Sequence, residues 1–158
     1  MHFSHAIRSI TPADATQVIA LMRIKAAEDG ISDEFFATED SVLSSPEHVT
    51  VLVAYTDEQS IVGYITYSFV YSLYAANDFV WLDDIFVPRE ARRSGIATLL
   101  VKAMCRHARR IGARRVDWIY KDTNDGGAAF YRNLGASVYV EYKNARLDQD
   151  GVHELTKE

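Results

Sequence analysis

Two adjacent acids, Asp83 and Asp84, interrupt a segment that is otherwise apolar from Val80 to Val87. Burying a carboxylate costs free energy unless the group is paired or used in chemistry. A regular strand points successive side chains to opposite faces, so only one of the two acids would face a given cleft unless a β-bulge turns the strand. The pattern favours a carboxylate acting as a general base, and it is also compatible with acids that reach solvent or pair with an arginine.

A basic turn and the start of a helix follow this strand. Pro88 ends the strand because it has no amide hydrogen, and apolar residues recur at helical spacing from Ile96. The first amides of a helix are unpaired, and Gly95 lets an anion approach them closely. With Arg92 and Arg93 beside these amides, the turn predicts a cradle for a pyrophosphate. An ordinary strand–turn–helix corner is the alternative, since neither a P-loop nor a G-x-G-x-x-G motif is present.

Two segments resemble the motifs of a known family. Arg92–Ala97 resembles the R/Q-x-x-G-x-G/A segment of the GNAT superfamily of acetyl-CoA-dependent N-acetyltransferases, and Asn124–Ala136 resembles its later N…A…FY…GA motif. They occur in the order and at the separation that are usual for the family. Within the superfamily the chain is most similar to the diamine (spermidine/spermine) acetyltransferases over about residues 5–142. That likeness is carried by Ser60–Tyr64, Leu82–Val87 and Phe130–Ser137.

The resemblance implies that acetyl-CoA is the cosubstrate. In the family, the main chain of a strand pairs with the pantetheine arm, the turn before the helix holds the pyrophosphate, and an asparagine and a tyrosine lie along the cofactor. The positions of this sequence that match are Ile85, Phe86, Val87, Arg92, Arg93, Ser94, Gly95, Ile96, Ala97, Thr98, Asn124 and Tyr131.

Acetyl transfer requires that the acceptor amine lose a proton and that the departing thiolate gain one. An alkylamine has a pKa of about 10.4, so presenting it neutral at pH 7 costs roughly 4.6 kcal/mol. The resemblance implies that Asp83, or as a second candidate Asp84, assists this deprotonation through water, and that Tyr131 protonates the thiolate. In the diamine enzymes a glutamate usually stands at the position of Asp83. From the residues alone, Tyr131 would be a helix tyrosine packed on the core.

Acidic residues also gather where the first long helix ends, and they include Glu28 and Asp29. They could attract an amine or simply form a hydrated loop. In the diamine enzymes the matching loop contributes to polyamine binding, and Asp117 and Trp118 correspond to a substrate-side segment. Trp118 is also compatible with a place in the core.

The hydrophobic pattern predicts the order β-α-α-β-β-β-α-β-α-β. The expected strands are 2–10, 49–55, 61–71, 79–87, 116–120 and 137–142, and the expected helices begin at Thr11, Thr38, Ile96 and Asp125. A last short strand and a frayed end are expected over 145–158. This order predicts an α/β (α+β) fold with a mixed, mainly antiparallel central sheet and helices on both faces, as the resemblance also implies.

Composition narrows the class of protein further. The 158 residues are 48% hydrophobic with a net charge of −5, which predicts one domain over residues 1–158 and no nucleic-acid binding. We expect no membrane span, no signal peptide and no internal disulfide, and therefore a cytoplasmic protein. The five histidines lack metal-ligand spacing, so no metal is expected. A basic cluster between Arg89 and Arg115 in an otherwise acidic chain suits an anionic cofactor and a cationic substrate.

The leading hypothesis is an acetyl-CoA-dependent N-acetyltransferase for a small amine, which would be a polyamine, a diamine or a lysine-like amino acid. The same chemistry on an aminoglycoside or a protein N-terminus is an alternative, and so is a non-catalytic acetyl-CoA-binding module. The resemblance further implies a homodimer, because the diamine enzymes pair subunits around their active sites.

Overall fold

The computed structural model describes residues 5–157. The chain divides into two compact units, Met1–Trp118 and Ile119–Glu158, which are described separately. The single domain expected from the chain length stays a prediction. The first unit holds the sheet and most residues of the expected site.

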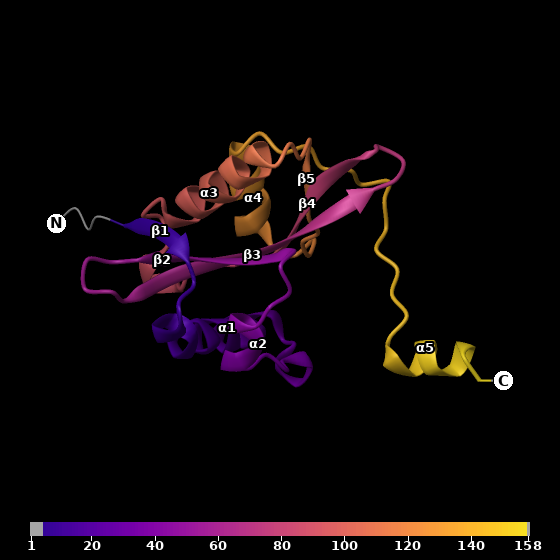
Figure 1. The fold of residues 1–158 in the computed structure, drawn as a ribbon, viewed down its shortest axis with the longest axis horizontal. Coiled ribbons are helices and arrows are strands. Elements are labelled where there is room, and N and C mark those ends of the chain that lie inside the picture. Colours follow the sequence, from indigo (N-terminus) through magenta and orange to yellow (C-terminus); the bar gives the residue numbers. More distant parts are fainter. Residues whose placement is uncertain (1–4, 158) are drawn as a thin grey trace. The chain divides into compact units, whose positions relative to one another are not determined.

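The first unit is built on a five-stranded sheet in the order β1-β2-β3-β4-β5 (Figure 1). The strands are β1 (Ala6–Ser9), β2 (Val49–Tyr55), β3 (Ile61–Ser72), β4 (Asn77–Phe86) and β5 (Val116–Asp117). The first four are antiparallel neighbours, whereas β4 and β5 are parallel. Parallel neighbours need a crossover connection, and α3 (Ile96–Arg110) supplies it. The mixed, mainly antiparallel sheet is therefore confirmed.

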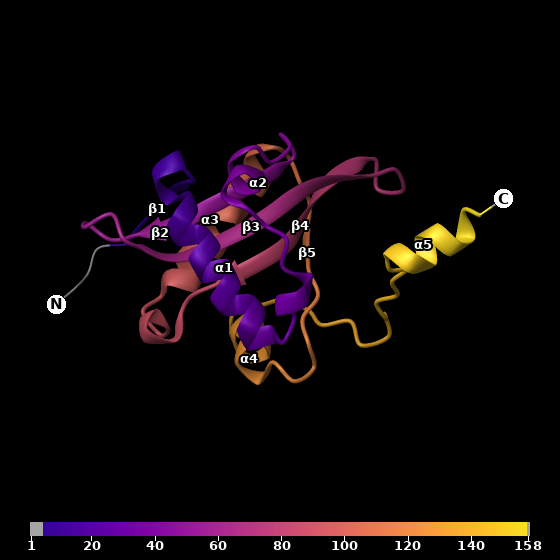
Figure 2. The same cartoon turned by 90° about the horizontal axis from the view of Figure 1, so that it is seen from below.

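Helices cover both faces of this sheet, as expected. Helices α1 (Ala15–Asp29) and α2 (Glu39–Leu43) lie on one face and α3 on the other (Figures 1 and 2). The short 3-10 turns are η1 (Pro12–Asp14), η2 (Ser32–Glu34) and η3 (Arg89–Ala91). Gly30 ends α1 with a positive φ of 69°, a conformation that glycine adopts at little cost.

The apolar side chains form a core on each face of the sheet. On the α3 face, Leu100 and Met104 pack with Ile65 of β3. On the α1 face, Val18 packs with Tyr64 of β3. Because side chains alternate along β3, consecutive residues of that strand belong to different cores.

Several boundaries differ from the sequence expectation. The first expected strand is observed as β1, and its residues 2–4 lie outside the described part of the chain. The strand expected over 116–120 is only two residues long, because its ladder with β4 ends there. None of the helices within residues 5–157 is long and apolar enough to cross a membrane.

The second unit contains α4 (Asp125–Asn133), which was expected, and α5 (Gln149–Leu155), which was not. The expected strand at 137–142 is wrong: its residues are not in a strand, and Val138, Tyr139 and Val140 remain exposed. A strand needs a neighbour to satisfy its amides, and sequence alternation alone does not supply one. The short strand expected after 145 is also wrong: residues 145–147 are not in a strand, and Asp148 caps α5 by accepting a 2.8 Å hydrogen bond from the Gly151 amide. The frayed end stays a prediction.

Candidate active site

Strand β4 carries a β-bulge at Asp83. Thr66 of β3 lies opposite Asp84 and Tyr67 lies opposite Leu82, so Asp83 has no residue opposite it. An extra residue in one strand shifts the alternation of side chains by one position. The two acids therefore do not follow the pattern of a regular strand.

The bulge moves Asp84 to the α1 face of the sheet. Leu82 packs in the core beneath α3, and two-residue alternation would have placed Asp84 on that same face. Instead, Phe86 packs with Tyr64 beneath α1, and Asp84 bonds to side chains on that side. Asp83 is exposed to solvent.

Both carboxylate oxygens of Asp84 are engaged. The Tyr64 hydroxyl donates to Oδ2 at 2.5 Å, and Nζ of Lys25 in α1 lies 3.0 Å from Oδ1. Lys25 also donates to Asp29, one turn along the same helix. The Asp84 side chain is 24% exposed, so water can still reach it. Sequence reasoning missed Lys25 and Tyr64; the only local signal was the i,i+4 spacing of Lys25 and Asp29.

These contacts change the acidity of the groups. Burial raises the pKa of Asp84 above its usual range, and this outweighs the opposing effects of Lys25 and Tyr64. Burial disfavours the charge of Lys25, but the carboxylates of Asp84 and Asp29 outweigh it and raise the pKa of Lys25. Burial also raises the pKa of Tyr64, which keeps its hydroxyl protonated as a donor. A carboxylate with a raised pKa is a stronger proton acceptor at neutral pH.

Strand β4 extends beyond its ladder with β5. Within the first unit, β4 and β5 pair only through Val80 with Val116 and Trp81 with Asp117. The expected pantetheine-pairing residues Ile85 and Phe86 lie past this point and Val87 follows them. An extended ligand that carries amides can add to such a strand edge by main-chain hydrogen bonds.

The turn after β4 leads into an uncapped helix. Gly95 precedes Ile96 with a φ of 84°, and Arg93 has a φ of 62°. Gly95 has no side chain to cap α3, so the first amides of that helix have no side-chain acceptor from it. The Ser94 hydroxyl donates to the carbonyl oxygen of Ala91 at 2.5 Å, which closes the turn.

Glu28 faces this turn rather than the Asp84 cluster. It accepts hydrogen bonds from Arg92 Nη2 at 2.8 Å and Arg89 Nε at 3.2 Å. These bonds, the one from Arg92 most of all, lower the pKa of Glu28. Arg92 Nε also donates to the carbonyl oxygen of Val87 at 2.8 Å, which fixes the guanidinium against the end of β4.

The remaining expected residues lie elsewhere in the two units. Asp117 accepts a 2.7 Å hydrogen bond from Arg115 Nε, and Trp118 packs against the core beneath α3. In the second unit, Asn124 caps α4 by accepting from the Gly127 amide at 2.9 Å. Tyr131 is buried in α4, with its ring centroid 5.2 Å from that of Tyr120.

The model of the acetyltransferase (GNAT) family matches residues 16–136. The chain belongs to this family. The match confirms the resemblance drawn from the two motifs, and it supports an acetyl-transferring enzyme that uses acetyl-CoA.

Curated relatives of this GNAT chain act on amines. It is 28% identical over 118 residues to an L-ornithine N5-acetyltransferase of Arabidopsis thaliana, covering 75% of this chain and 52% of that protein. The chain therefore spans about half the length of that relative. It is 24% identical over 163 residues to a thialysine N-epsilon-acetyltransferase of Sus scrofa, covering 94% and 95% of the two chains.

Solved structures share the fold of this GNAT chain. An integron cassette protein from the mobile metagenome of V. cholerae superposes with a TM-score of 0.79 at 23% identity, over 98% of this chain and 99% of that one. An aminoglycoside acetyltransferase from an uncultured soil sample gives a TM-score of 0.76 at 20% identity, over 91% and 97%. At these identities the likeness establishes the fold.

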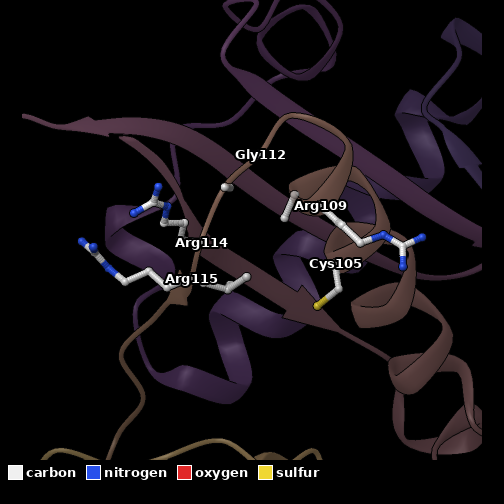
Figure 3. A pocket seen from close by; sticks show the side chains of 8 residues that line it. Cys105, Arg109, Gly112, Arg114 and Arg115 are labelled. Carbon is white, nitrogen blue, oxygen red and sulfur yellow. The ribbon is translucent and has the colours of Figure 1, made fainter. Parts of the chain in front are cut away.

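A hollow of about 420 Å³ at the end of α3 lies apart from the GNAT motifs (Figure 3). None of the expected site residues lines it. Figure 3 shows the guanidinium of Arg109 directed away from those of Arg114 and Arg115, so the three cations do not converge on one anion. Arg115 instead lies over the Phe79 ring, 4.2 Å from its centroid. Within residues 5–157, no three histidine, cysteine or acidic side chains gather as a metal site.

Proposed function

We propose that this chain transfers the acetyl group of acetyl-CoA directly to a primary amine of a small cationic acceptor, which is a polyamine, a diamine or a lysine-like amino acid. The observation that carries the proposal is the bulge in β4. It brings Asp84 to a half-buried position with a raised pKa, on the same strand that runs into the uncapped turn.

The residues that follow Asp84 are suited to binding acetyl-CoA. The extended edge of β4 at Ile85–Val87 would pair with the amides of the pantetheine arm. The amides at the start of α3, next to Gly95, would hold the pyrophosphate together with Arg93 and Thr98. A main-chain amide of β4 would also polarise the thioester carbonyl, as an oxyanion-hole donor does.

The proposed reaction involves three proton transfers. The carboxylate of Asp84, or of exposed Asp83, accepts a proton from the acceptor ammonium through water, and partial desolvation of the amine assists. The neutral nitrogen attacks the thioester carbon, the carbon–sulfur bond breaks, and the Tyr131 hydroxyl protonates the departing thiolate. The nitrogen then loses its second proton through water to the Tyr131 oxygen, which forms the neutral amide and restores the phenol. The role of Tyr131 rests on the family motif that contains it.

Two observations support the proposed class of acceptor: the charges near Asp84 and the acceptors named for the curated relatives. Lys25 lies between the carboxylates of Asp29 and Asp84, and acidic side chains gathered at a site favour a cationic acceptor. The named acceptors of the curated relatives, ornithine and thialysine, are amino acids with a side-chain amine. An aminoglycoside, a protein N-terminus or a non-catalytic acetyl-CoA-binding role remain the alternatives.

We also propose a cytoplasmic homodimer. The exposed apolar side chains of the second unit support a covering partner, and a second copy of the chain is the partner that the family resemblance implies. These side chains are Val138, Tyr139, Val140, Tyr142, Leu147, Val152 and Leu155. A monomer by light scattering at micromolar concentration would exclude the homodimer.

The test is thiol release from acetyl-CoA with a panel of amines at pH 7 to 9. The panel contains spermidine, putrescine, lysine, ornithine, an aminoglycoside and a short peptide. We expect turnover of the small amines and little turnover of the peptide. Tight acetyl-CoA binding without turnover of any amine would favour the non-catalytic alternative.

A further inference from the structure

A second hollow, of about 350 Å³, lies on the α3 face of the sheet, opposite to the face that carries Asp84. We call it the basic hollow. Its lining residues come from β1, β2, β3 and α3 and are Ile7, Arg8, Ser9, Thr50, Leu52, Tyr67, Ala103, Arg106, His107 and Arg110. Three arginines and a histidine belong to this set and no acid does, although the whole chain has a net charge of −5. The hollow is therefore a basic site in an acidic chain.

One face of α3 supplies most of the basic groups. Ala103, Arg106, His107 and Arg110 are spaced i, i+3, i+4 and i+7, which places them on the same side of the helix. Arg106 and Arg110 are exposed, and neither forms an ion pair or a hydrogen bond within residues 5–157. Side chains at i and i+4 have Cβ atoms about 5–6 Å apart, so both guanidinium groups can reach one ligand. Arg8 differs from them because its charge is paired with Asp14.

Tyr67 holds His107 at the edge of the basic hollow. Its hydroxyl lies 2.8 Å from His107 Nδ1, and the imidazole packs edge-on against the rings of Tyr67 and Phe69. Burial raises the pKa of Tyr67 to about 12, so its hydroxyl keeps its proton at neutral pH. Burial, and to a lesser extent Arg110, lowers the pKa of His107, so the ring is neutral at pH 7. The unpaired positive charge of the hollow at pH 7 thus belongs to Arg106 and Arg110.

The groups that line the basic hollow match the chemistry of an organic phosphate. Guanidinium groups present paired N–H donors that fit phosphate oxygens. The charge of a phosphate monoester near pH 7 is about −1.5 to −2, which two unpaired arginines can balance. The side chains of Ile7, Leu52 and Ala103 add apolar surface, which an organic group can cover and an inorganic phosphate cannot.

From this arrangement we infer that the basic hollow binds a small organic phosphate monoester. Arg106 and Arg110 hold the phosphate, and the apolar side chains of β1, β2 and α3 contact the organic part. Because the hollow lies on the opposite face of the sheet from Asp84, this binding site is separate from the proposed acetyl transfer and does not depend on it.

The test is calorimetric titration of the chain with phenyl phosphate in the presence of saturating CoA, which fills the proposed pyrophosphate cradle. We expect phenyl phosphate to bind, and inorganic phosphate to bind about tenfold more weakly because it has no apolar ring. Benzoate, which has the ring but only one negative charge, should also bind about tenfold more weakly. Absence of phenyl phosphate binding would overturn the inference. Equal or tighter binding of inorganic phosphate or of benzoate would overturn the assignment to an organic phosphate.

Substitutions locate the bound phosphate. Arg106→Gln and Arg110→Gln each remove one charge-assisted contact and should weaken phenyl phosphate binding about tenfold, equivalent to about 1.4 kcal/mol. Arg109→Gln is the matched control, because Arg109 is also exposed on α3 but does not line the basic hollow. It should leave the affinity unchanged. An equal loss in Arg109→Gln would mean that the anion responds to the charge of the helix in general, and the inference would fail.

The affinity for CoA separates this site from the cofactor site. Glutamine is a good helix former, so we expect Arg106→Gln and Arg110→Gln to keep the fold and to bind CoA as the parent chain does. A parallel loss of CoA affinity would place the phosphate in the cofactor site and overturn the inference. Because the titration needs no acetyl transfer, failure of the proposed function would leave its outcome unchanged.

Discussion

The guanidinium of Arg92 lies 2.8 Å from the carboxylate of Glu28, so a residue expected to bind the cofactor is paired with one expected to bind the substrate. Both side chains are partly exposed, and Arg89 adds a second contact to the same carboxylate. Glu28 thus neutralises part of the basic turn instead of contributing to the acidic cluster around Asp84.

Glu28→Gln should tighten acetyl-CoA binding. Removing the carboxylate frees the charge of Arg92 for the pyrophosphate, and we expect the dissociation constant to fall by about threefold, as for one partly exposed ion pair. Calorimetric titration with CoA measures this dissociation constant. The control is Glu58→Gln, which also removes one negative charge but lies in an exposed turn. Weaker CoA binding in Glu28→Gln would mean that Glu28 chiefly positions Arg92.

Gly95 and Gly112 form a matched pair for testing the anion cradle. Their φ values are 84° and 79°, and a Cβ on either would meet no heavy atom within 4 Å. Alanine at either position should cost about 1–2 kcal/mol of unfolding free energy, because an L-residue is disfavoured there. Only Gly95→Ala should also weaken CoA binding, since its Cβ enters the space proposed for the pyrophosphate. Equal CoA affinity in both variants would argue against the cradle.

Asp84→Asn should lower kcat/KM for the acceptor by about 10²-fold at pH 7, the usual contribution of a general base. The deficit should shrink as the pH rises toward ~10.4, where the amine loses its proton without help. In the parent chain, activity should fall as the pH drops through the raised pKa of Asp84, because the base becomes protonated. Asp83→Asn changes the exposed acid and should lower kcat/KM less than Asp84→Asn does. A larger loss in Asp83→Asn would make Asp83 the general base instead.

Tyr131→Phe tests the proposed general acid. We expect kcat at pH 7 to fall by about 10²-fold with the acetyl-CoA KM unchanged, since the hydroxyl would act only as the thiolate leaves. The loss should diminish above about pH 8.5, where a thiolate no longer needs a proton to leave. Tyr120→Phe removes a hydroxyl from the neighbouring ring and serves as the control. Unchanged turnover in Tyr131→Phe would exclude the assignment.

Asp14 links the first strand to the first helix. It is 2% exposed and accepts hydrogen bonds from Arg8 Nη2 at 2.9 Å and from the Thr11 amide at 2.7 Å. Asp14→Ala leaves the Arg8 charge without its partner, so the free energy of unfolding at pH 7 should fall by about 3 kcal/mol. Urea denaturation measures this free energy. The control Asp57→Ala, in an exposed turn, should leave the free energy of unfolding almost unchanged.

The destabilisation caused by Asp14→Ala should become smaller as the pH falls. The bonds from Arg8 and Thr11 hold the pKa of Asp14 well below its usual range, so the folded state binds its proton more weakly than the unfolded state. Its stabilising contribution is therefore complete above about pH 4 and is lost as the pH falls below that value. A difference between parent and variant that stays constant down to pH 2 would contradict this account.

Local sequence patterns were sufficient to predict most of the helices and strands. Thr11 and Pro12 marked the start of the first helical segment, Gly30 its end, and the apolar spacing after Ile96 predicted α3. These signals depend on the preferences of a few neighbouring residues, which the sequence contains directly. The strand expected at 137–142 failed because pairing needs a second strand, which alternation cannot specify.

By itself, the sequence determined the family, the order of most elements, and the turn that precedes α3 with Gly95 at its end. Only the tertiary structure decided the surroundings of Asp84. The bulge that turns it, its pairing with Lys25 of α1 and its bond to Tyr64 of β3 join residues 20 to 59 positions apart. Such contacts follow from register and packing, because a one-residue shift in a strand reverses which face each side chain occupies.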